Sequence, residues 1–254
     1  MNKGIDVSRH NGVIDWEKVK KAGIDFAMIR AGYGSGTIDD KFERNIKECN
    51  RLGIPCGVYW FSYAYTPEMA RKEAQAVLKA VKPYTLEYPI AFDFEDDSIS
   101  YAAKQGVKIT KKLATSIVEA FCEEIEKNKY YAVNYANPNY LKEYFDEKLL
   151  KKYSLWLAHW VSGESPSQNC VMWQYSAKGK VNGISGDVDM NKGFVDFPSV
   201  IRKVGLNGLS EKKWYSDALE WGIANGITDG NNPEEPATRA QVIVMLKRFR
   251  DKFI

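Results

Sequence analysis

The sequence predicts an α/β fold, an irregular TIM-like barrel of the type (β/α)5(β)3, followed by a small α-helical C-terminal module. Short apolar runs typical of β-strands recur eight times in the first 190 residues, and helical patterns separate the first five of them. The last three runs lie too close together for full helices between them. Alternating strands and helices favour a parallel sheet covered by helices, and eight such strands close into a barrel.

The expected strands are short, apolar and rich in β-branched and aromatic residues. They span residues 4–7, 26–30, 57–61, 89–95, 131–135, 155–158, 171–175 and 187–190. Apolar residues recurring every three or four positions predict the longer helices between them. These helices cover residues 16–22, 41–52, 67–81 and 110–127. Gly53 is typical of a helix C-terminus and Pro67 of a helix start.

A composition shift near residues 204–208 predicts a boundary between a barrel domain over 1–204 and a second unit over 209–254. The second unit contains a helix expected over 211–225 and another that begins at a capping box over 238–241. Two helices and a loop bury too little apolar surface to fold well alone. We therefore expect this unit to pack on the barrel or on another chain.

Composition excludes several classes of protein. The 36 Lys and Arg residues are scattered among 33 Asp and Glu residues, and the net charge of +3 is no footprint of a nucleic-acid partner. No apolar run approaches the roughly 20 residues of a membrane span. Only His10 and His159 are present and no C-x-x-C pair occurs, which argues against a zinc hydrolase. We expect no metal and no cofactor, and we expect chemistry based on carboxylates.

Two acids end the expected strand over 89–95. Strand alternation places Asp93 and Glu95 on one face, at the carboxyl end where barrel enzymes carry their chemistry. Their mutual repulsion raises the pKa of at least one carboxyl group, which then holds a proton near neutral pH. A solvated acidic turn is an almost equally good interpretation of this segment taken alone.

Two further acids fall at expected strand ends. Asp6 ends the first strand and Asp189 the last, and these strands are neighbours in a closed barrel. Because burying like charges costs free energy, four acids around one barrel mouth indicate a function rather than a stabilising role. We favour acid catalysis over a metal site in which the carboxylate oxygens bind a hard cation.

Aromatic residues are expected around the same barrel mouth. Flat rings beside carboxylates suit sugar rings, on which acids act at the glycosidic oxygen, although about half of such strand residues belong to a core. Arg30, at the end of the second strand, is a candidate partner for a carboxylate. The candidate substrate-binding residues are Arg30, Tyr33, Tyr59, Phe61, Tyr135, Trp156 and Trp173, and Tyr63, Trp160 and Tyr175 share their pattern.

Through these motifs the chain resembles the glycoside hydrolase family 25 lysozymes, muramidases of the Chalaropsis type that are common among phage endolysins and bacterial autolysins. The resemblance covers residues 3–197 and includes Gly57-Val58-Tyr59-Trp60-Phe61, where the family usually has His in place of Trp60. The other motifs are Gly4-Ile5-Asp6-Val7-Ser8-Arg9-His10-Asn11-Gly12, Phe26-Ala27-Met28-Ile29-Arg30-Ala31, Asp93-Phe94-Glu95, Leu155-Trp156-Leu157-Ala158-His159-Trp160, Trp173-Gln174-Tyr175 and Val188-Asp189-Met190-Asn191.

The resemblance implies a peptidoglycan hydrolase that cleaves the β-1,4 bond between N-acetylmuramic acid and N-acetylglucosamine. It implies that Glu95 is the general acid. Asp93 would stabilise positive charge or steer the N-acetyl group of the substrate, and Asp6 and Asp189 would form the floor of the groove. Inverting, retaining and substrate-assisted routes all stay open. Bacterial peptidoglycan is the implied partner.

The tail resembles a single S-layer-homology module through residues 214–218, 226–230 and 236–241. Such modules imply binding to secondary cell-wall polymers, and they normally occur in threes. A single copy either completes a wall-binding site through homo-oligomerisation, which we favour, or packs on its own barrel. Trp214 and Arg239 are the candidate wall contacts.

Other classes of function predict different sequences. A non-catalytic wall-binding protein on the same barrel predicts loss of one or more of the four acids, yet all four are present. An amidase or peptidase acting on the wall would need more His residues or a paired Cys and His, and the sequence has few His residues and no such pair. The N-terminus has no apolar signal segment, so we expect an endolysin made in the host cytoplasm that acts on the wall after release. An autolysin of wall turnover is the alternative.

Overall fold

The chain forms two compact units, Met1–Ser210 and Glu211–Ile254. The computed structural model describes residues 1–161, 169–210 and 213–254. No helix in these described ranges is both long and apolar enough to span a bilayer.

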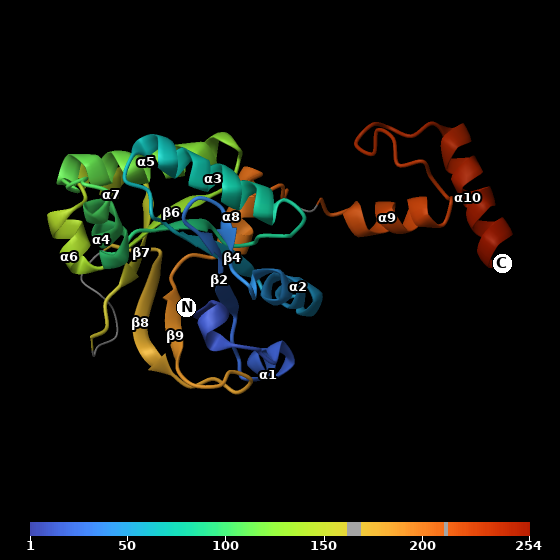
Figure 1. The fold of residues 1–254 in the computed structure, drawn as a ribbon. Coiled ribbons are helices and arrows are strands. Elements are labelled where there is room, and N and C mark those ends of the chain that lie inside the picture. The colour runs from blue at the N-terminus through green and yellow to red at the C-terminus, as the bar shows by residue number, and fades with distance from the viewer. Residues whose placement is uncertain (162–168, 211–212) are drawn as a thin grey trace. The chain divides into compact units, whose positions relative to one another are not determined.

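The first unit contains a closed eight-stranded barrel (Figure 1). The barrel closes because β1 pairs with both β2 and β9, while the two-residue β3 only extends β2. Successive barrel strands from β1 to β8 are parallel. The described strands are β1 (Asn2–Val7), β2 (Phe26–Tyr33), β3 (Thr37–Ile38), β4 (Cys56–Phe61), β5 (Ile90–Asp93), β6 (Ala132–Ala136), β7 (Ser154–Ala158), β8 (Met172–Gly179) and β9 (Val188–Gly193). The predicted α/β barrel is thereby confirmed for the first unit.

The last strand runs against the expected parallel direction. β9 is antiparallel to both of its neighbours, β8 and β1. The connection over residues 180–187 is too short for a crossover, so it returns the chain as a hairpin. This reversal places the start of β9, and not its end, at the mouth formed by the carboxyl ends of the parallel strands.

Helices follow each of the first five barrel strands, as the sequence predicts. Thr66 and Thr110 cap the two longest of these helices. The sequence patterns missed α4, α6, α7 and α8, which are too short to show a clear apolar period. The helices of the first unit are α1 (Trp16–Lys21), α2 (Phe42–Leu52), α3 (Pro67–Val81), α4 (Asp96–Lys104), α5 (Lys111–Lys127), α6 (Pro138–Glu143), α7 (Glu147–Lys152) and α8 (Phe197–Val204).

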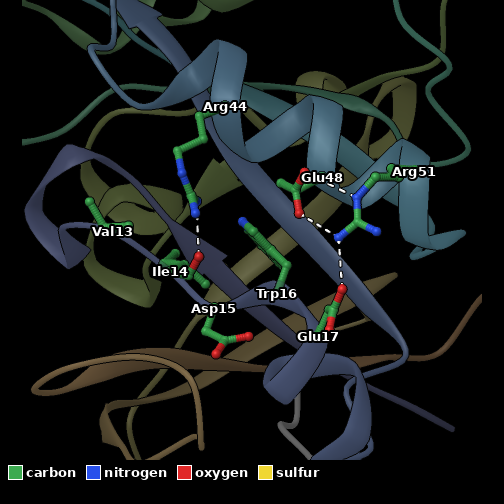
Figure 2. A pocket seen from close by; sticks show the side chains of 8 residues that line it. All are labelled: Val13, Ile14, Asp15, Trp16, Glu17, Arg44, Glu48 and Arg51. Carbon is green, nitrogen blue, oxygen red and sulfur yellow. Dashed lines mark hydrogen bonds and ion pairs between the residues drawn. The ribbon is translucent and has the colours of Figure 1, made fainter.

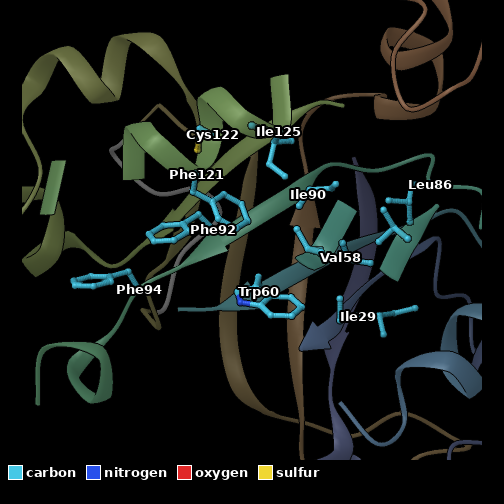
Figure 3. Close-up of a cluster of buried hydrophobic side chains, with 14 of the residues drawn as sticks. Ile29, Val58, Trp60, Leu86, Ile90, Phe92, Phe94, Phe121, Cys122 and Ile125 are labelled. Carbon is cyan, nitrogen blue, oxygen red and sulfur yellow. The ribbon is translucent and has the colours of Figure 1, made fainter. Parts of the chain in front are cut away.

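Strand alternation separates two hydrophobic layers. The outer layer lies between the strands and the covering helices. Figure 3 shows part of it, where Phe92 of β5 lies between Phe94 and the α5 residue Phe121. The inner layer fills the barrel with residues of β2, β5, β6, β7 and β8. Phe197 and Ile201 bring α8 into this inner layer, so the helix closes the end of the barrel opposite the mouth.

Residues 205–208, expected at the domain boundary, belong to the first unit. Asn207 anchors them. Its amide nitrogen donates to the carbonyl oxygens of Leu86 and Tyr88 at 3.0 and 3.1 Å. Its Oδ1 accepts from the N–H of Tyr131 at 2.9 Å. These bonds join the segment after α8 to the starts of two barrel strands.

The second unit contains α9 (Ser216–Ala224) and α10 (Arg239–Phe253). Thr238 and Gln241 form the expected capping box at the start of α10. Trp221 of α9 contacts Phe249 and Phe253 of α10, with ring centroids 6.2 and 5.5 Å apart. All three rings nevertheless stay at least 40% exposed. The described part of this unit therefore has no buried apolar core of its own.

Candidate active site

Four acids meet at the barrel mouth. Asp93 is the last residue of β5, and Glu95 follows as the N-cap residue of α4. Asp6 of β1 and Asp189 of β9 are direct register partners. The carboxyl groups lie close enough that the charge of Glu95 raises the pKa values of both Asp93 and Asp6. The structure therefore brings together the four residues that the sequence picked from three separate strands.

Asp6 is held by two amides that the sequence analysis did not select. Its Oδ2 accepts from Gln174 Nε2 at 3.0 Å and from Asn191 Nδ2 at 2.7 Å. Burial, followed by the charge of Asp189, raises the pKa of Asp6 to about 8, and the two amides oppose the shift. A sequence signal could have selected Gln174 and Asn191. Both are polar residues at strand positions that alternation directs into the barrel, where most neighbours are aromatic or apolar.

Aromatic donors orient these two amides in turn. The Tyr135 hydroxyl donates to Gln174 Oε1 at 3.1 Å, and Trp160 Nε1 donates to the same oxygen at 3.1 Å. Trp156 Nε1 donates to Asn191 Oδ1 at 2.8 Å. Each amide therefore has its oxygen fixed by a ring and its nitrogen directed at Asp6. The floor of the mouth is a hydrogen-bonded network and not a set of free acids.

Asp93 and Glu95 differ in their surroundings. Asp93 is 6% exposed, and its Oδ1 is buried without a hydrogen-bond partner among the described residues. Burial, then the charges of Glu95 and Asp6, raise its pKa, while Arg30 opposes the shift. Glu95 is only partly buried; burial raises its pKa, and a hydrogen bond with Tyr135 lowers it. Such burial argues against the alternative of a solvated acidic turn, and it favours the protonated form of both acids more than water would.

The described residues contain no group of three or more His, Cys, Asp or Glu side chains arranged to hold a metal ion. The metal alternative therefore finds no support in the geometry of the four acids. Hydrogen bonds from neutral amides and a phenol satisfy the floor instead. This arrangement suits proton transfer and charge stabilisation.

A family model described as glycosyl hydrolases family 25 matches residues 5–184, which is most of the barrel unit. The chain belongs to glycosyl hydrolase family 25. The predicted family is thereby confirmed for the barrel. The match ends before the second unit, so the resemblance of the tail to an S-layer-homology module stays a prediction.

Relatives and solved structures agree with the family 25 assignment. Lysozyme M1 of Streptomyces globisporus is 33% identical over 201 residues, which cover 75% of this chain and 67% of that protein. The autolytic lysozyme of Clostridium acetobutylicum is 26% identical over 244 residues, covering 94% and 71%. The autolysin LytC of Streptococcus pneumoniae, solved with a synthetic peptidoglycan ligand, superposes with a TM-score of 0.66 at 31% identity. That match covers 75% of this chain, which spans about half (46%) of the length of LytC.

Several predicted aromatic residues lie around the acids of this family 25 barrel. The Trp156 ring lies 4.9 Å from Tyr135 and 6.1 Å from Tyr59, both edge-on. The charges of Asp6 and Asp93 help raise the pKa of Tyr59, which places its hydroxyl near both carboxyl groups. Phe61 is the register partner of Asp93.

An outer row of rings continues from Phe61. The ring of Phe61 lies 5.3 Å from Tyr63, which in turn lies 5.1 Å from Tyr101 of α4. On the other side, the Tyr33 hydroxyl accepts from the Arg9 guanidinium at 3.2 Å. These half-exposed rings form the rim of the mouth, and Tyr33 belongs to it as expected.

Trp173 does not join the candidate site. It lies on the opposite face of β8 from Gln174, and it is 1% exposed. Its Nε1 donates to the carbonyl oxygen of His159 at 2.7 Å, and Lys192 Nζ lies 5.0 Å from its ring. Because its outward-facing ring is covered, Trp173 cannot stack on a ligand in the mouth.

Trp60 likewise faces away from the mouth, between its inward-facing neighbours Tyr59 and Phe61. It is fully buried in the outer layer, and its Nε1 donates to the carbonyl oxygen of Gly34 at 3.1 Å. A side chain on Gly32 would collide with this ring. The residue that replaces the usual His of the family therefore has a packing role in this structure.

Arg30 pairs with a carboxylate, but with one that the sequence analysis did not select. Its guanidinium contacts Asp39 Oδ2, with Nη2 at 2.7 Å and Nε at 2.8 Å. Asp39 is 2% exposed and also accepts from the backbone N–H groups of Arg9 and Lys41. This fixed guanidinium is the positive charge that opposes the rise in the pKa of Asp93.

A separate pocket of about 340 Å³ lies between α1 with its preceding loop and α2 (Figure 2). Across it, Arg51 of α2 contacts Glu17 at 3.2 Å, and Arg44 of α2 donates to the carbonyl oxygen of Ile14 at 2.9 Å. None of the four mouth acids lines this pocket. It is a surface hollow between two helices and is distinct from the candidate site.

The two predicted wall contacts of the tail lie in the second unit. Trp214 is 94% exposed, with its ring edge-on to Tyr215 at 5.6 Å. Arg239 is the first residue of α10 and directly follows its cap, Thr238. Both side chains are open to solvent, and the role predicted for them stays a prediction.

Proposed function

We propose that this chain is a lysozyme that cleaves the β-1,4 bond between N-acetylmuramic acid and N-acetylglucosamine in bacterial peptidoglycan. The observation that carries the proposal is the pair of acids at the end of β5, whose raised pKa values arise inside a family 25 barrel. A partly exposed acid with a raised pKa beside a buried acid is the arrangement that hydrolysis of a glycosidic bond requires.

In this proposal Glu95 donates its proton to the leaving glycosidic oxygen. It is the more exposed of the two acids and takes a hydrogen bond with Tyr135, which orients it. Asp93 stabilises the positive charge that develops on the sugar or orients the N-acetyl group of the substrate. Asp6 and Asp189 form the floor and set the charge that both acids experience. Tyr59 and Phe61 are partly exposed and provide surfaces for the sugar rings. Tyr135 and Trp156 were predicted to bind the substrate as well, but both are buried, so they act beneath this surface through their hydrogen bonds to Gln174 and Asn191.

The relatives support peptidoglycan as the substrate. Two of them are named lysozyme and autolytic lysozyme, and LytC was solved with a synthetic peptidoglycan ligand. The proposed bond specificity is the muramidase cleavage that the family resemblance implies.

Glu95→Gln tests the proposed reaction. The wild type should release reducing ends from purified cell walls without releasing new amino groups. Glu95→Gln should lower that release at least about 100-fold, because an amide cannot donate the proton. Asp187→Asn, an exposed acid paired with Lys180, is the matched control and should keep full activity. Release of amino groups would favour an amidase, and undiminished activity of Glu95→Gln would remove this residue from the role.

We further propose that the enzyme is an endolysin, made in the host cytoplasm and active on the wall after release. In a bacterium that expresses the chain, lysis should then require co-expression of a membrane pore. Lysis without the pore would favour the autolysin alternative.

We also propose that the second unit joins a second copy of the chain and binds wall polymer through the assembled surface. Support comes from the apolar side chains of its helices. Ile243 and Leu246 are 65% and 63% exposed, and α10 has no buried residue. Such exposure favours association.

Light scattering of the full chain tests this assembly. The wild type should be larger than a monomer, and Leu246→Glu should reduce it to a monomer with unchanged activity on soluble glycan. Val204→Glu, at an exposed apolar residue of the first unit, is the control and should not change the mass. A monomeric wild type would contradict the assembly.

A further inference from the structure

Glu73 is a buried acid outside the barrel mouth. It lies on α3 with 2% of its surface exposed, and burial raises the pKa of its carboxyl group to about 8. Its Oε1 accepts from the N–H of Tyr63 at 3.0 Å, and the Ser62 hydroxyl also hydrogen-bonds to the carboxyl group. Oε2 is buried without a hydrogen-bond partner among the described residues. Because burying an acid costs free energy, packing of α3 alone does not account for this residue.

Ser62 connects Glu73 to the end of β5. Its N–H donates to the carbonyl oxygen of Asp93 at 2.8 Å. Its own carbonyl oxygen accepts from Ser98 Oγ at 2.6 Å. Ser62 and Ser98 are both fully buried. The turn that follows β4 is therefore bonded on one side to Glu73 and on the other to Asp93 at the end of β5 and to Ser98 in α4.

Ser98 completes the connection to Glu95. The N–H of Glu95 donates to Ser98 Oγ at 3.0 Å, and the N–H of Ser98 donates to the carbonyl oxygen of Glu95 at 2.9 Å. Ser98 is the third residue of α4, so its hydroxyl and its N–H together fix the backbone of Glu95 at the start of this helix. The same hydroxyl thus binds the backbone of Glu95 and the carbonyl oxygen of Ser62, so the backbone on both sides of Phe94 is fixed.

We propose that Glu73 is a positioning residue for Asp93 and Glu95. An accepting oxygen at position 73 holds the turn over residues 62–64, and this turn together with Ser98 fixes the direction in which both carboxyl groups project. The role acts through the backbone, so Glu73 does not touch the substrate. The kinetic test of this role rests on the proposed function, because it measures hydrolysis of glycan chains. A misplacement of about 1 Å at a reacting group can cost on the order of 100-fold in rate.

Four variants of the full chain test this role. Glu73→Leu removes the accepting oxygen, whereas Glu73→Gln keeps an oxygen at the same position. Ser98→Ala removes the hydroxyl that accepts from the N–H of Glu95 and donates to the carbonyl oxygen of Ser62. Val77→Ala, one helical turn further along α3 and fully buried, is the control for loss of stability alone. Thermal unfolding followed by circular dichroism gives a temperature at which all variants are folded. At that temperature kcat and KM are measured on soluble glycan chains.

The expected result separates positioning from stability. Glu73→Leu and Ser98→Ala should each lower kcat about tenfold or more with KM within about twofold, and their double variant should lose less than the product of both. Glu73→Gln should keep kcat within about twofold. Val77→Ala should keep wild-type kcat although it is less stable. Wild-type kcat in Glu73→Leu, an equal loss in Val77→Ala, or an equal loss in Glu73→Gln would each overturn the proposal.

A second readout does not depend on activity. Carbon-13 NMR of the glutamate carboxyl groups follows the titration of Glu95, which the inactive Glu95→Gln variant assigns. The midpoint should move in Glu73→Leu and should stay unchanged in Glu73→Gln and Val77→Ala. A midpoint that does not move in Glu73→Leu overturns the positioning role. A wild type without activity on walls contradicts the proposed function but leaves this readout in place.

Discussion

Asp6 and Asp189 face each other as register partners on the antiparallel strands β1 and β9. Side chains at such positions lie on the same face and in close reach. Burial and the charge of Asp189 raise the pKa of Asp6 to about 8, so Asp6 holds a proton at neutral pH. The barrel mouth therefore carries less negative charge than four ionised carboxylates would. The lower charge reduces the free-energy cost of burying the four acids close together.

Asp6→Asn should make stability less dependent on pH. The folded pKa of about 8 lies above the ordinary value of 3.8, so the folded state keeps a proton that the unfolded chain releases. The wild type therefore loses stability as pH rises between these two values. Urea unfolding at pH 5 and pH 8.5 should show Asp6→Asn gaining about 2 kcal/mol or more relative to the wild type over that range. Parallel stability curves would contradict the raised pKa.

Asp97→Asn should move the pH profile of activity. The charge of Asp97 helps to raise the pKa of Glu95. Removing this charge lowers that pKa, so Glu95 loses its proton at a lower pH and the alkaline limb of kcat should shift downward by a few tenths of a pH unit. Because Asp97 is exposed, added salt should reduce the difference between the variant and the wild type. Asp187→Asn should leave the profile unchanged, and an upward shift in Asp97→Asn would contradict the assignment of the titrating acid.

Trp156→Phe should lower activity, whereas Trp173→Phe should leave it unchanged. Trp156 donates to Asn191, which holds Asp6, so its loss frees the amide and should lower kcat about tenfold. Trp173 faces away from the mouth, so Trp173→Phe should keep kcat and KM and only reduce stability. Steady-state kinetics on soluble glycan checks both. A raised KM in Trp173→Phe would return this residue to the binding surface.

Trp60→Phe should reduce stability without changing the chemistry. The variant loses the hydrogen bond to Gly34 and part of a fully buried ring, which together cost about 2 to 4 kcal/mol. Thermal unfolding measures the loss, and kcat at 25 °C should stay within about twofold of the wild type, because Trp60 does not face the acids. A large loss of kcat in a folded variant would show that this position acts on the site.

Local sequence patterns predicted much of the fold. Strand runs, the helix signals at Pro67 and Gly53, and the capping box at 238–241 are short-range features, and the structure has the corresponding elements. Strand alternation placed Asp93 and Glu95 on the same face of one strand. In the structure β5 already ends at Asp93 and Glu95 is the N-cap residue of α4, yet both acids lie at the barrel mouth. The short helices α4, α6, α7 and α8 were not predicted because they contain too few turns to show a clear apolar period.

By itself, the sequence determined the order of strands and helices and the acids available at the strand ends, because alternation and apolar periods depend only on neighbouring residues. Only the tertiary structure decided that β9 reverses, so that Asp189 reaches the mouth from the start of its strand. It also decided that Gln174 and Asn191 hold Asp6 and that Arg30 pairs with Asp39. Strand direction, register and the partners of buried polar groups depend on contacts between residues far apart in the chain, which local patterns do not contain.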